Sequence, residues 1–148
     1  MNQPFSQIHA GWTVVALATC GLAGLAGCSD GLPHRVPVSG IVKIDGKPLS
    51  QGSVMVIPAN DRPAGGSIGP DGRFTLTSYE PNDGVVVGTH KVTVAATEHL
   101  SERETRWLVP KKYNNAGSSG LTVTIDGPTD DLEINLTWDG KHPFTERM

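Results

Sequence analysis

The chain is poor in charge, in aromatic residues and in cysteine. Only 18% of its 148 residues are charged, 5% are aromatic, and two are cysteines. With a formal net charge of −3 and no cluster of lysine and arginine beyond the pair Lys111-Lys112, it shows no sign of the basic surface that nucleic acids require. Its 18 glycines and 11 prolines suit many turns between short strands and suit helices poorly.

The first 27 residues lack charged side chains, and every lysine, arginine, aspartate and glutamate lies after position 28. The uncharged run from Trp12 to Ala26 is typical of the apolar region of a secretory signal peptide. A membrane-spanning helix over residues 10–27 is the alternative. It is disfavoured because that run is at the lower length limit, contains four glycines and is followed by no basic stop-transfer cluster. We therefore predict a cleaved signal peptide over residues 1–27.

Leu25-Ala26-Gly27-Cys28 resembles the lipobox of bacterial lipoproteins, in which small residues precede an acylated cysteine. The resemblance implies lipidation of Cys28, by a diacylglyceryl group on its thiol and usually an acyl chain on the new amine. Cys20 matches the motif less well and is interpreted as an apolar residue of the leader. Leaders of that family start with lysine or arginine, which residues 1–11 lack. After cleavage Cys28 would be the only thiol, so the mature chain could form no internal disulfide.

Residues 28–37 are predicted to be a lipid-anchored linker, since they contain Gly31, Pro33 and Pro37 and no apolar periodicity. Nine residues after Cys28 can span at most roughly 30 Å, so the domain should lie close to the lipid surface. In the lipoprotein family an aspartate directly after the lipidated cysteine retains the protein at the inner membrane. Ser29 occupies that place here, which favours the outer membrane over the inner one.

Residues 38–136 alternate between apolar and polar side chains with a period of two, which indicates strands. Asp-Gly pairs at 45–46 and 71–72 are signals for tight turns. We predict an all-β domain, a single Greek-key-like β-sandwich of six to seven strands. Only residues 97–107 have helical spacing (Glu98, Glu102 and Arg106), with too few apolar residues for a core helix. The C-terminal tail, residues 137–148, has no predicted place.

Several segments in this order resemble carboxypeptidase regulatory-like domains: VSGIV at 38–42, DGKPL at 45–49, DGRF at 71–74 and GTHKVTV at 88–94. The resemblance covers residues 36–136 and implies a seven-stranded, transthyretin-like (Ig-like) sandwich. Segments 109–113 and 119–123 further resemble short bacterial lipoproteins built from this one module. These resemblances imply fold and location far more than activity.

Signs of catalysis are missing from the pattern. None of the five histidines has a partner at a metal-ligand spacing, and no Gly-x-Ser-x-Gly motif is present. We therefore predict no catalytic residue, no metal and no cofactor. The candidate binding residues are the aromatic ones Tyr79, Trp107, Tyr113 and Trp138, because rings on loops can stack on sugars or hold a partner's side chains. The favoured alternative is that Trp107 and Tyr113 attach the long segment 98–120 to the sandwich.

The leading hypothesis is a membrane-anchored envelope lipoprotein whose non-catalytic sandwich is an interaction or structural module. Its expected partners are the lipid membrane, through Cys28, and an envelope protein or a glycan. A carbohydrate-binding module that uses the aromatic loop residues is the alternative, and an enzyme comes third.

Overall fold

The computed structural model describes residue 31 and residues 33–147 of the chain, so the predicted leader and Cys28 lie outside the described residues. The described part is all-β, as predicted, with one short 3₁₀ helix, η1 (Lys111–Asn114). No helix in these ranges is long and apolar enough to cross a bilayer. The strands are β1 (Arg35–Val36), β2 (Val38–Ile44), β3 (Lys47–Pro48), β4 (Gly52–Ile57), β5 (Ala64–Ile68), β6 (Arg73–Thr75), β7 (Val85–Val86), β8 (Gly88–Ala95), β9 (Thr97–Ser101), β10 (Glu104–Trp107), β11 (Leu121–Ile125), β12 (Thr129–Leu136) and β13 (Phe144–Arg147).

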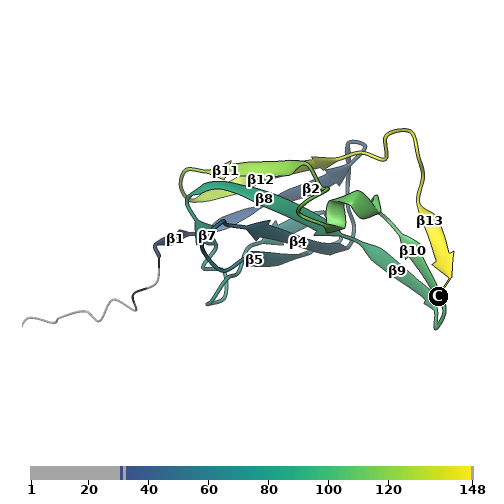
Figure 1. The fold of residues 1–148 in the computed structure, drawn as a ribbon, viewed down its shortest axis with the longest axis horizontal. Coiled ribbons are helices and arrows are strands. Elements are labelled where there is room, and N and C mark those ends of the chain that lie inside the picture. Colours follow the sequence, from purple (N-terminus) through teal and green to yellow (C-terminus); the bar gives the residue numbers. More distant parts are fainter. Residues whose placement is uncertain (1–30, 32, 148) are drawn as a thin grey trace, which may run out of the picture. The chain divides into compact units, whose positions relative to one another are not determined.

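Two sheets form the body of the domain (Figure 1). One is antiparallel throughout, with the order β11-β8-β4-β5. The other is built around β2, which pairs antiparallel with β3 and β6 and parallel with β12. Gly127 and Pro128 carry the chain from β11 in the first sheet to β12 in the second, so these two strands do not form a hairpin with each other.

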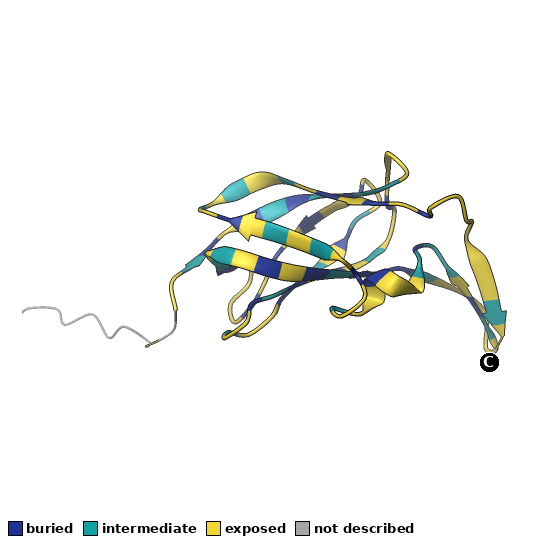
Figure 2. Ribbon diagram, turned by 45° about the horizontal axis from the view of Figure 1, so that its top comes forward, coloured by how far each residue is buried: buried dark blue, intermediate teal, exposed yellow. Residues whose placement is uncertain are grey.

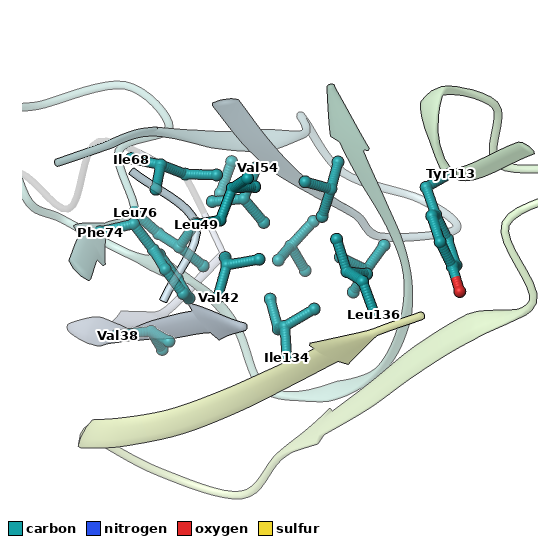
Figure 3. Close-up of a cluster of buried hydrophobic side chains, with 14 of the residues drawn as sticks. Val38, Val42, Leu49, Val54, Ile68, Phe74, Leu76, Tyr113, Ile134 and Leu136 are labelled. Atoms are coloured by element: carbon teal, nitrogen blue, oxygen red, sulfur yellow. The ribbon is translucent and has the colours of Figure 1, made fainter. Parts of the chain in front are cut away.

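Both sheets contribute their apolar faces to one core, which gives a sandwich-like arrangement (Figures 2 and 3). Val42 of β2, Val56 of β4 and Val92 of β8 are each fully buried. Full burial of a side chain of this size stabilises the fold by roughly 1.5–3 kcal/mol. The period-two pattern identified these faces, but four of its apolar positions are only half-buried: Ile44, Leu121, Val123 and Leu132.

The folded domain begins earlier than predicted. Arg35 and Val36 fall within the predicted linker, although the resemblance described above starts at residue 36. They form β1 and pair antiparallel with β7, and Val36 is buried. The strand depends on Gly84, whose φ is +80° and whose position leaves no room for a side chain: a Cβ there would lie 1.8 Å from the Val36 carbonyl oxygen. The part of the linker that can act as a tether therefore ends at residue 34.

Residues 97–107, which have helical spacing, do not form a helix. This segment forms the antiparallel hairpin β9–β10, and Glu98 and Arg106, whose spacing suggested a helix, are register partners across it. The tail supplies a third strand, because β13 pairs with the other edge of β10. We call this three-stranded sheet, in the order β13-β10-β9, the arm. It lies at the opposite end of the domain from β1 and β7 (Figure 1).

Candidate binding site

Tyr113, a candidate binding residue, lies in η1 with its ring buried in the core (Figure 3). Its hydroxyl accepts a hydrogen bond from the Thr137 amide at 3.2 Å and donates one to the Thr137 carbonyl at 3.3 Å. The residue therefore joins η1 to the start of the tail. A buried ring with a fully used hydroxyl is not available to a ligand, so Tyr113 is a structural residue here.

Trp107, at the end of β10, is half-buried in a cluster that links the arm to η1. Its ring stacks on Phe144 of β13, with centroids 6.5 Å apart and planes 16° apart. The indole Nε1 donates a hydrogen bond to Glu146 Oε2 at 3.1 Å. The Lys111 ammonium lies 5.0 Å from the Trp107 ring centroid and 2.7 Å from both Glu146 oxygens. These hydrogen bonds, from Lys111 first and then from Trp107, lower the pKa of Glu146.

Tyr79 belongs to a different region. It is exposed, and two guanidinium groups lie near its ring, that of Arg35 at 4.3 Å and that of Arg62 at 5.1 Å from the centroid. Its hydroxyl donates to Asp61 at 3.3 Å. Because Arg35 belongs to β1, Tyr79 lies at the end of the domain opposite the arm. The structure therefore does not bring Tyr79 and Trp107 into one site.

Asp83 organises the loop that carries Tyr79. Its carboxylate accepts hydrogen bonds from the amides of Ser78, Tyr79 and Glu80 and from Arg35 Nε. Partial burial by itself raises the pKa of this carboxyl, but the four hydrogen bonds outweigh it and hold the pKa below its ordinary value. The loop and β1 are thus joined by one carboxylate.

A groove of about 670 Å³ lies where the arm leaves the body. Its apolar lining includes Ile44, Leu108 and Trp138, and its walls are the segments 45–50 and 140–143. We call it the elbow groove. Its size falls within the range of roughly 300–1,000 Å³ usual for ligand sites.

The walls of the elbow groove are held by backbone contacts. The Asp45 amide donates to the Leu136 carbonyl at 3.0 Å, and the Trp138 amide donates to Asp45 Oδ1 at 3.3 Å. Trp138 is only 6% exposed, and its ring meets Phe144 edge-on at 6.4 Å. These contacts fix the turn after β2 and the start of the tail against each other.

The rim of the elbow groove is cationic. Lys47 and Lys141 are exposed there, and neither lysine pairs with a carboxylate among the described residues. In contrast, each of the lysines 43, 111 and 112 has a carboxylate partner. Asp45 is the acidic residue of the lining, and one of its oxygens is engaged by the Trp138 amide. The groove therefore combines an apolar floor with unbalanced positive charge at its edge.

Trp138 is among the candidate binding residues named from the sequence, but the groove that it lines was not predicted. Its residues come from the β2–β3 turn, the end of the arm and the tail, and no local pattern connects these three segments. The described residues contain no group of three histidine, cysteine, aspartate or glutamate side chains placed to hold a metal ion. No protein-family model, curated protein or solved structure matches the chain.

Proposed function

We propose that this chain is a lipid-anchored protein of the bacterial envelope, whose sandwich serves as a non-catalytic interaction module. The observation that carries the proposal is the lipobox-like motif that ends at Cys28, and the position of β1 adds to it. Because the domain begins at Arg35, only residues 29–34 separate it from Cys28 of the lipobox-like motif. Six residues span at most about 20 Å. A chain acylated at Cys28 would hold the β1 end of its domain close to the lipid surface.

The same geometry supports a display role for the other end. β2 starts directly after β1 and runs for seven residues to Ile44, which lines the elbow groove. At about 3.3 Å per residue, the strand carries the chain roughly 23 Å from the tethered end. The elbow groove and the arm thus lie at the end away from the anchor, where a partner in the envelope can reach them.

We further propose that the domain is a transthyretin-like sandwich with Greek-key-like connections. Two sheets around one core and a connection that crosses between them at Gly127-Pro128 support this. An outer-membrane location rests on Ser29, the residue after the proposed lipidation site.

Substitution of Cys28 tests the anchor. In Cys28→Ser we expect full-length, unacylated protein, measured by intact mass and by membrane fractionation of the expressing cells. Cys20→Ser is the matched control, because Cys20 lies in the proposed leader, and we expect it to be processed like the wild type. Normal cleavage and acylation of Cys28→Ser would refute the lipoprotein assignment.

A carbohydrate-binding module is the second candidate, supported by the Trp107–Phe144 stack, in which Phe144 is 41% exposed. Flat, rigid ring surface of this kind suits contact with a sugar. A glycan array with the detergent-solubilised full chain tests it: we expect binding that Phe144→Ala abolishes and Tyr79→Ala leaves unchanged. Uniformly negative binding by the wild type would exclude this candidate.

A further inference from the structure

The arm carries an exposed apolar residue between two acidic ones. Leu100 of β9 is 49% exposed, and Glu98 and Glu102 beside it are exposed as well. Glu98 and Leu100 point to the same face of β9, since successive side chains of a strand alternate. We call residues 98–102 the arm tip.

The acidic residues of the arm tip are weakly engaged within their own chain. Glu98 lies 3.9 Å from Arg106, and both side chains are about half exposed (47% and 48%). Glu102 has no ion-pair partner among the residues that the structure describes. β9 is also the edge strand of the arm, so its outer backbone groups have no neighbouring strand in the sheet. The arm tip therefore offers a leucine, two carboxylates and an open strand edge.

The elbow groove has the complementary features. Its floor is apolar, and Lys47 and Lys141 at its rim lack carboxylate partners within the described ranges. Groove and arm adjoin, because Leu108, the residue after β10, lines the groove. Surfaces that are complementary to each other and lie at the same end of one molecule can contact each other reciprocally across a two-fold axis.

We propose that the arm tip of a second copy of this chain docks in the elbow groove, and that the contact is reciprocal. Leu100 enters the apolar floor, and Glu98 and Glu102 lie beside Lys47 and Lys141 of the partner. The leucine excludes water from the centre of the contact, and the charges at the exposed rim select the register and make the association salt-dependent. The inference rests on the interaction role proposed above, whereas it does not depend on lipidation of Cys28.

Charge reversal tests the pairing directly. The purified full chain in detergent is examined by analytical ultracentrifugation over a dilution series, with the detergent contribution subtracted. We expect a dimer for the wild type, and dimers at least tenfold weaker for Lys47→Glu/Lys141→Glu and for Glu98→Lys/Glu102→Lys. Mixed in equal amounts, the two reversed variants should form a heterodimer, because each restores the charge that the other lacks.

Lys91→Glu is the matched control. Lys91 is also exposed and without a carboxylate partner in the described part of the chain, but it lies on β8, outside the groove. We expect it to associate like the wild type. The proposal would be overturned if the wild type were monomeric at about 100 μM. It would also be overturned if Lys91→Glu weakened the dimer as much as the groove variants do, or if the two reversed variants failed to form a heterodimer. A monomer whose groove variants change the glycan-array signal would assign the groove to a sugar instead. Acylation is measured by intact mass and association by sedimentation. Failure of the lipid-anchor proposal can therefore be distinguished from failure of the dimer proposal.

Discussion

Replacing Gly40 with alanine should damage the fold severely, because the backbone of β12 lies against β2 at this residue. A Cβ at position 40 would lie 1.9 Å from the carbonyl oxygen of Leu132 and 2.7 Å from its carbonyl carbon. Both atoms belong to the backbone of β12, next to the register shift between Thr129 and Leu132. No side-chain rotation can relieve the contact, so the two strands must separate by more than about 1 Å to reach ordinary van der Waals distances.

The expected cost follows from three terms. Overpacking costs typically 1–3 kcal/mol. Weakening two or three hydrogen bonds of the β2–β12 ladder adds about 0.5–1.5 kcal/mol each. Restricting the unfolded chain by a glycine-to-alanine change offsets roughly 0.4–1 kcal/mol of this. The free energy of unfolding should therefore fall by about 3 kcal/mol, which corresponds to a loss of roughly 10–15 °C in Tm for a domain of this size.

Urea unfolding followed by circular dichroism measures the change, with Gly127→Ala as the matched control. A Cβ at position 127 would have no neighbouring atom within 4 Å, so this alanine variant should stay within about 0.5 kcal/mol of the wild type or be slightly more stable. If Gly40→Ala were as stable as Gly127→Ala, the close parallel approach of β2 and β12 would be refuted.

Three further substitutions test other contacts. Asp83→Asn should lower the free energy of unfolding by about 1–3 kcal/mol at pH 7, since it weakens charge-assisted hydrogen bonds. The difference should vanish as the pH falls through the lowered pKa of the native carboxyl, and a difference independent of pH would contradict the assignment. Tyr113→Phe should lower the free energy of unfolding by about 1–2 kcal/mol and speed hydrogen exchange of the Thr137 amide. Unchanged exchange at that amide would show that the Tyr113 hydroxyl does not hold the tail. Glu146→Gln should lower the melting temperature above pH 4.5, because the pKa of Glu146 is depressed in the folded protein. The difference from the wild type should disappear as the pH falls through that depressed pKa, and a difference that stays constant with pH would argue against the contact with Lys111.

The strands of the body could be predicted because their signal is local. Alternation at Val92 and Val94 or at Ile134 and Leu136 reports directly that one face of a strand is buried. The partner of each strand could not be predicted in the same way. β2 and β12 pair in parallel although about ninety residues separate them, and nothing in either segment specifies the other.

The arm shows why a local pattern can mislead. Glu98 and Arg106 are eight residues apart, a spacing that fits one face of a helix and equally fits two residues facing each other across a hairpin. The hairpin is favoured over a helix because β10 also pairs with a third strand, β13, which the tail provides. Residues 97–107 have too few apolar side chains to define a buried face by themselves, so tertiary pairing determined their conformation.

Among the candidate residues, Trp107 and Tyr113 were expected to attach the segment 98–120 to the sandwich, and the buried ring of Tyr113 agrees with that expectation. The contacts that they make could not be predicted, because the tail that supplies Thr137 and Phe144 had no predicted place. Lys47 and Lys141 carried no signal at all, since a lysine beside a turn is ordinary in any surface loop. Cys28 is the reverse case: its proposed chemistry rests on the four-residue motif alone, and it stays a prediction for the mass measurement to test.

The sequence by itself determined that the domain is built of strands, because the alternation of side chains and the many turn formers are properties of neighbouring residues. Only the tertiary structure decided that β1 belongs to the domain, that the tail completes the arm, and that three distant segments enclose the elbow groove. The physical reason is that concave sites and unbalanced charges arise from residues brought together by packing. The positions of these residues along the sequence do not show which of them pack together.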